Sequence, residues 1–114
     1  MTVKQMYDRA LVLLGETDFI GVKDDAEILK QAITIVDVVG EELHSLVSHH
    51  KWQHLTDCNE EIPLHDNALS VMPYGVAMWI AKSEGDMTQQ SYFATLYTQK
   101  QAKLTRIRGM RDVL

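Results

Sequence analysis

Three residues spaced four apart, His50, His54 and Cys58, are the only arrangement in the sequence that suits a metal ion. If one helix ran through them, their side chains would share a face, and imidazole with thiolate suits Zn²⁺. However, the helical spacing of apolar residues fails between Trp52 and Cys58, and no fourth ligand is evident. We therefore expect no metal and no other cofactor, and we interpret the three residues as polar positions at a helix end and in a loop.

The sequence also shows no convincing arrangement of catalytic groups. Cys58 beside a histidine could be a nucleophile, but no third group that would orient the histidine can be named. The carboxylates of residues 18–42 are explained by helix capping, solvation and loop positions, and the isolated glycines form no phosphate-binding loop. The sequence therefore predicts a protein that is not an enzyme.

The first half of the chain predicts two helices. Apolar residues with a 3.6-residue period predict a helix from about Thr2, which can cap it, to Leu14, with Gly15 as its C-terminal stop. A loop should follow over residues 16–23. A second, longer helix should begin at Asp24, in a capping box with Glu27, and end near residue 48.

The second half predicts an arm and two further helices. Residues 49–65 lose the helical period, and Pro63 favours an extended arm or short hairpin. A short turn over residues 67–72 should precede a third helix that starts at Pro73, where a missing N–H costs nothing. That helix is apolar on nearly all sides, so it should be the buried centre, with Trp79 in the core. The fourth helix should run from about Thr88 to Arg108. The predicted fold is therefore all-α, a single compact bundle of about four helices.

Three apolar residues are candidates for contacts between subunits. Ile35 and Val38 lie off the main apolar stripe of the second helix, so they belong either to the monomer's core or to a second face that packs on a neighbouring subunit. Trp52 follows the same helix, and it either folds over the end of the core or contacts a partner.

Charge is distributed unevenly along the chain. Residues 1–99 contain six basic and fifteen acidic residues, which disfavours sequence-specific DNA binding, whereas residues 100–114 contain five basic and one acidic. Residues 105–114 are expected to be a flexible basic tail. The basic positions are candidates for contact with a partner protein or with DNA: Lys100, Lys103, Arg106, Arg108 and Arg111.

The sequence predicts a protein made in the cytoplasm. The N-terminus lacks the uninterrupted apolar stretch of a signal peptide, and no apolar run approaches the length of about 20 residues that a membrane span needs. No contact with membranes is expected. The single cysteine suits a reducing compartment.

The segment Pro73 to Leu104, PYGVAMWIAKSEGDMTQQSYFATLYTQKQAKL, resembles the C-terminal half of the head–tail connector, or adaptor, proteins of long-tailed double-stranded DNA phages and prophages. In that family a helix ends on a Gly-Asp turn that opens the last helix. The front half matches more loosely, through the order of its helices and Trp52. The matching residues are Pro73, Tyr74, Gly75, Ala77, Ala81, Gly85, Asp86, Tyr92, Phe93, Leu96 and Tyr97.

The resemblance implies a structural role. Connector subunits form a ring under the portal protein, extend the channel through which packaged DNA passes, and present a surface to a tail or stopper protein. Such a protein would move from the host cytoplasm to the virion neck. Three alternatives stay open: another phage morphogenesis subunit for tail completion or packaging, a small DNA-binding regulator, and an enzyme.

Overall fold

The computed structural model describes residues 1–16 and 26–113, with side chains up to Leu104, and it contains four helices in this part of the chain. They are α1 (Val3–Leu14), α2 (Ala26–Val47), α3 (Asp66–Ser83) and α4 (Met87–Val113). No strand occurs among these residues; Thr2 and Glu61 form one isolated antiparallel bridge. The prediction of an all-α four-helix bundle is confirmed. The expected loop over residues 16–23 and the Asp24 capping box lie largely outside the described residues.

Helix α1 begins and ends where the sequence predicts. The Thr2 side chain accepts a hydrogen bond from the Gln5 backbone N–H, and the Gln5 side chain accepts one from the Thr2 N–H, which makes a capping box. Gly15 ends the helix with φ at 77°, a left-handed conformation that glycine adopts without steric cost.

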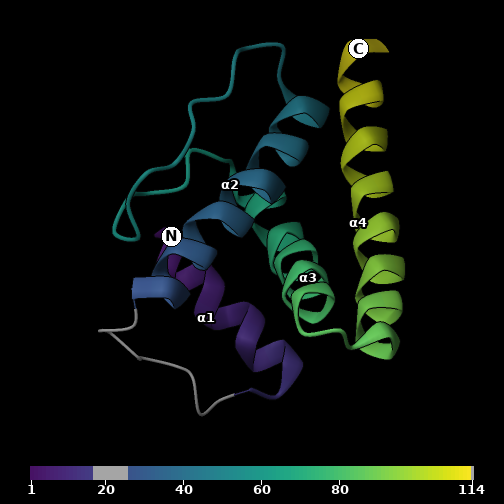
Figure 1. The fold of residues 1–114 in the computed structure, drawn as a ribbon. Coiled ribbons are helices and arrows are strands. Elements are labelled where there is room, and N and C mark those ends of the chain that lie inside the picture. Colours follow the sequence, from purple (N-terminus) through teal and green to yellow (C-terminus); the bar gives the residue numbers. More distant parts are fainter. Residues whose placement is uncertain (17–25, 114) are drawn as a thin grey trace.

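Helix α3 is the centre of the bundle. It packs against each of the other three helices, and it stands between α1 and α4 in Figure 1. Its fully covered side chains include Met72, Val76 and Ile80. Trp79, which was expected in the core, is only partly buried and packs on the core's edge with the Lys82 ammonium 4.7 Å from its ring centre.

The start of α3 was predicted wrongly. The helix begins at Asp66, so the expected short turn is its first part and Pro73 lies inside it. Proline removes one backbone hydrogen bond and crowds the preceding turn. Burial of Val71 and Met72 before it and of Val76 after it holds the helix continuous across this local defect.

Residues 48–65, called the arm below, join α2 to α3 without a helix, as expected for this part of the chain (Figure 1). The arm buries Trp52, Leu55 and Ile62 in the core. It also pairs with the beginning of the chain, because the Val3 N–H donates to the Glu60 carbonyl and the Ile62 N–H donates to the Met1 carbonyl. The arm is therefore fixed along α1 and α2 rather than projecting from the bundle.

Candidate functional site

The three predicted metal-ligand candidates do not share a face. Their segment is not helical, so the four-residue spacing does not bring them together. His50 is exposed, and its backbone carbonyl accepts a hydrogen bond from the His44 ring at 2.8 Å. Cys58 is partly buried with its thiol 3.5 Å from the Leu29 carbonyl. The structure instead places His54 against two carboxylates of α2, Asp37 and Glu41.

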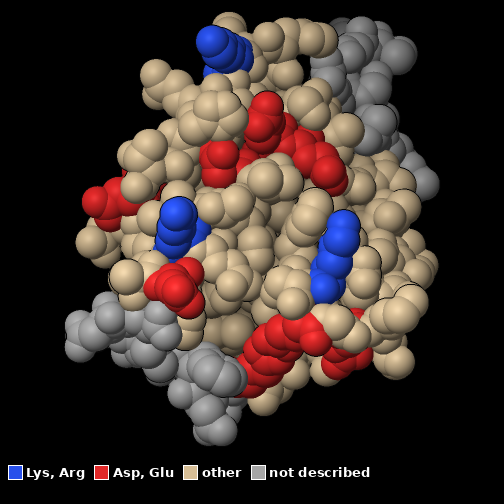
Figure 2. Space-filling view, in the orientation of Figure 1, with Lys and Arg blue, Asp and Glu red and all other residues tan. Residues whose placement is uncertain are grey.

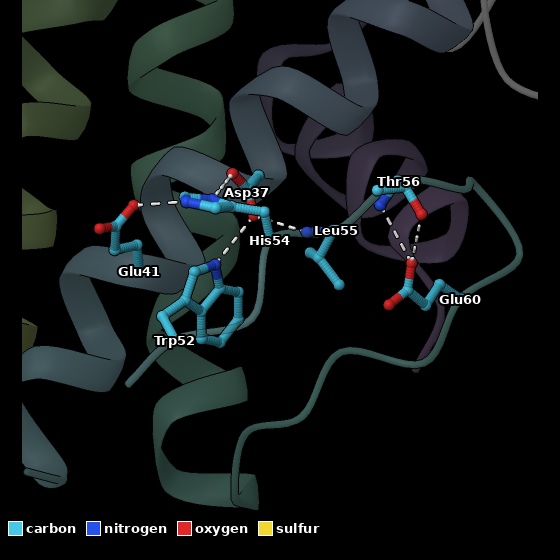
Figure 3. Close-up of polar contacts among 7 residues, drawn as sticks. All are labelled: Asp37, Glu41, Trp52, His54, Leu55, Thr56 and Glu60. Atoms are coloured by element: carbon cyan, nitrogen blue, oxygen red, sulfur yellow. Dashed lines mark hydrogen bonds and ion pairs between the residues drawn. The ribbon is translucent and has the colours of Figure 1, made fainter. Parts of the chain in front are cut away.

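Asp37 is the residue on which the first part of the arm is held (Figure 3). Its Oδ1 accepts hydrogen bonds from the Trp52 indole N–H and from the Leu55 backbone N–H, both at 2.8 Å. Its Oδ2 lies 2.8 Å from Nδ1 of His54. One carboxylate thus fixes three arm residues on α2, and two of these bonds satisfy partly buried N–H groups.

These contacts shift the pKa values of Asp37 and His54. Partial burial alone would raise the pKa of Asp37, but hydrogen bonds from Leu55, Trp52 and His54 favour the carboxylate and lower it overall. The pKa of His54 is raised because its hydrogen bond to Asp37 and the charge of that carboxylate favour the imidazolium. At neutral pH, Asp37 is therefore an anion that holds the arm.

Sequence reasoning identified His54 but missed Asp37 and Glu41. Asp37 is a charged residue between Val36 and Val38 in an otherwise apolar stretch, and Glu41 follows it by one helical turn, so both lie on one face of α2. That interruption was the available signal. The pairing with His54 depends on how the arm folds back, which no local pattern fixes.

The candidate interface residues separate into buried and exposed. Trp52 is buried, in the position expected if it folds over the end of the core, and its ring contacts Gly40 of α2. Ile35 is 8% exposed and belongs to the core, the first of the two possibilities that the sequence left open, and it is not available as an interface residue in the monomer. Val38, 41% exposed, alone keeps the surface position expected of an interface residue.

Several residues that carry the connector resemblance lie where α3 and α4 pack, whereas Tyr92 is exposed. Gly75 allows this approach, because a methyl group there would lie 2.8 Å from the Tyr97 ring and 2.9 Å from Val39. Gly85 turns the chain with φ at 75°, and the Asp86 carboxylate accepts from the Gln89 N–H at 3.0 Å to cap α4.

Phe93 and Tyr97 are buried on the inner face of α4. The Tyr97 hydroxyl is buried near Glu42, and both its burial and that carboxylate raise its pKa.

The basic positions continue along α4, which runs past the predicted end at Arg108 to Val113. The Lys100 ammonium stands 4.6 Å from the centre of the Tyr74 ring, a cation–π contact, and Lys103 is exposed. The side chains of Arg106, Arg108 and Arg111 lie outside the described residues. Figure 2 shows carboxylates in several groups on one face of the bundle, among fewer lysine and arginine side chains.

Comparison with family models, with curated proteins and with solved structures finds no match. Within the described residues, no helix combines the length and the apolar character needed to cross a membrane. The same part of the chain buries no charged side chain completely. The fold of the described residues is therefore that of an all-α four-helix protein.

Proposed function

We propose that this chain is the subunit of a head–tail connector ring, which joins a phage portal to a tail or stopper protein and extends the channel for packaged DNA. The proposal is supported by one observation above all. Within the segment that resembles the connector family, Gly75, Phe93 and Tyr97 lie where the consecutive helices α3 and α4 pack against each other.

Each of these residue types has a physical purpose there. Gly75 permits contact with the Tyr97 ring, Gly85 supplies the left-handed turn, and Asp86 caps the next helix. The Tyr74 ring makes a cation–π contact with the Lys100 ammonium. The motif therefore specifies how α3 and α4 are joined, and a shared junction of this kind supports a shared fold with connector subunits.

The surface suits a subunit that assembles through proteins rather than through specific DNA contacts. The acidic excess of residues 1–99 disfavours adhesion to phosphates, which a conduit for moving DNA must avoid. Val38, an apolar side chain exposed on α2, is the candidate for contact with a neighbouring subunit. The basic positions on α4 are the candidates for contact with the portal.

Co-expression with the portal protein of the same genome tests the proposal. We expect the two proteins to co-purify and to show stacked rings by negative-stain electron microscopy. Val38→Glu should give a folded monomer by circular dichroism that forms no ring, whereas Gln53→Glu, at an exposed arm position, should assemble normally.

Two results would contradict a connector. The wild-type chain could fail to join the portal even at high concentration. It could instead be a dimer that retards a specific DNA fragment in a gel, which is the behaviour of a regulator. A chain that joins a tail or packaging protein but not the portal would be another morphogenesis subunit.

A further inference from the structure

Three side chains with metal-ligating atoms meet on the outer side of α2 (Figure 3). Nδ1 of His54 lies 2.8 Å from Oδ2 of Asp37 and 3.9 Å from Oε2 of Glu41. One ligand atom from each residue lies within 4.8 Å of the other two. Two of the ligands come from one face of α2 and the third comes from the arm.

We propose that Asp37, Glu41 and His54 bind a divalent first-row transition metal ion, with Zn²⁺ the best fit. One imidazole nitrogen and two carboxylate oxygens form a mixed donor set that Zn²⁺ accepts at about 2.0–2.2 Å, with solvent able to supply a fourth ligand. Mg²⁺ and Ca²⁺ prefer oxygen alone and are disfavoured by the imidazole.

The geometry needs only side-chain adjustment. Ligand atoms on a tetrahedral ion with those bond lengths stand about 3.4 Å apart. The distance from His54 to Asp37 is shorter than this, and the distance from His54 to Glu41 is longer. To hold the ion, His54 and Asp37 must therefore move slightly apart, and His54 and Glu41 must move closer together. The side chains of His54 and Glu41 are 66% and 56% exposed, which leaves room for these rotations.

Asp37 is prepared for this role by its other contacts. The Trp52 and Leu55 N–H groups occupy Oδ1 and fix the plane of the carboxylate, so Oδ2 is directed at the imidazole. Such hydrogen bonds to a ligating carboxylate orient it and strengthen metal binding. On binding, the metal replaces the hydrogen on Nδ1 of His54, and the neutral ring keeps its hydrogen on Nε2.

The bound ion would fasten the arm to α2. In the structure, His54 is joined to α2 by one hydrogen bond to Asp37 and by the longer contact to Glu41. A metal would replace these with coordinate bonds and would balance the two carboxylate charges. This inference stands independently of the connector proposal, because it concerns the folded monomer alone.

The test is isothermal titration of Zn²⁺ into the full-length protein without an affinity tag, at neutral pH. We expect one ion per chain, and a loss of affinity of at least about tenfold in both His54→Ala and Glu41→Gln. Both positions are exposed, so these variants should fold normally. His50→Ala and Cys58→Ser are matched controls from the same arm, and they should bind as the wild type does.

Hydrogen exchange supplies a second readout. Zn²⁺ should slow exchange of the Leu55 amide in the wild type and should leave it unchanged in His54→Ala. Affinity should also fall as the pH is lowered, because protons compete for the imidazole.

The proposal is overturned if the wild type shows no saturable binding, or if both ligand variants retain its affinity. It is also overturned if His50→Ala or Cys58→Ser weakens binding as much as His54→Ala does, because the ligands would then be other residues of the arm.

Discussion

The indole ring of Trp52 lies directly on Gly40, so closely that a methyl group added to the glycine would stand 2.7 Å from the ring's Cζ2 atom. The contact joins the arm to the middle of α2. It also explains why a glycine, which weakens a helix, is found at this position. Because glycine has no side chain, the indole can pack directly against the helix backbone.

Gly40→Ala is therefore expected to destabilise the protein. Alanine favours a helix over glycine by about 1 kcal/mol, but overpacking a core position costs about 1–3 kcal/mol. Since the ring is fixed by its bond to Asp37, we expect a net loss of roughly 1 kcal/mol in the free energy of unfolding, measured with urea. In a Trp52→Ala background the same change should instead stabilise. If Gly40→Ala stabilises the wild-type chain as well, the Trp52 ring must be able to move away from the helix and make room for the added methyl group.

Asp37→Ala should loosen the arm. The variant leaves the Trp52 and Leu55 N–H groups without their acceptor, at a cost of roughly 2–3 kcal/mol, whereas Asp37→Asn keeps a carbonyl oxygen and should cost less. Hydrogen exchange at the Leu55 amide should rise in both variants, more in Asp37→Ala. Glu41→Gln, at an exposed position whose carboxylate lies 3.9 Å from His54, is the control and should change little.

The pH dependence of the Asp37 variants follows from the lowered pKa of this carboxyl. A lowered pKa gives stability that is present above the unfolded value of 3.8 and that is lost as the pH falls through the folded value. The difference in stability between the wild type and Asp37→Asn should therefore shrink in acid. A difference that stays constant to strongly acidic pH would show that the charge of Asp37 plays no part.

Local sequence patterns determine the ends of α1 but not the start of α3. The cap at Thr2 and the stop at Gly15 are local, and they begin and end α1 as predicted. Pro73 gave a false helix start, because its local cost is outweighed by burial on both sides, which only the tertiary structure supplies.

The candidate site was harder to predict than the helices. His54 meets Asp37 across 17 positions of sequence, through an arm whose path is set by Trp52 entering the core. A spacing rule for helices could not find this pair because the segment is not helical. Burial of Ile35 rather than Val38 likewise depends on how α2 packs in the bundle, which the pattern of apolar residues left open.

Ile35→Glu and Val38→Glu should behave in opposite ways as monomers. A carboxylate in place of buried Ile35 would be unpaired in the core, so we expect a loss of several kcal/mol or complete unfolding. Val38 is exposed, and its replacement should change stability by less than about 0.5 kcal/mol. Circular dichroism during thermal unfolding compares them. A stable Ile35→Glu monomer would return this residue to the candidate interface.

Truncation after Leu104 should leave a folded monomer that no longer joins the portal. Leu104, 4% exposed, is the last described side chain in the core, and the deletion keeps it while removing Arg106, Arg108 and Arg111. Salt weakens contacts to acidic proteins and to DNA alike, so salt alone does not separate them. Docking to empty portals does. If the truncated chain docks but filled heads then leak DNA, the basic residues serve DNA instead.

Glu16 should make the protein less stable as the pH rises. It follows α1 near Glu84 and Asp86, and partial burial, a hydrogen bond with Glu84 and the charges of both neighbours raise its pKa to about 7. Because this lies above the unfolded value of 4.5, the folded state holds the proton more tightly. The contribution to stability is therefore complete below 4.5 and is lost as the pH passes through about 7.

Glu16→Gln cannot ionise and should escape that loss. Above about pH 7 the variant should melt higher than the wild type, by a few degrees at most because Glu16 is only partly buried and solvent screens its interactions. Below 4.5 the two melting temperatures should converge. Glu61→Gln is the control: it removes the ion pair between Glu61 and the N-terminal ammonium, so it should bring no gain at high pH. Parallel melting curves for the wild type and Glu16→Gln across the whole range would mean that the three carboxylates do not interact in solution.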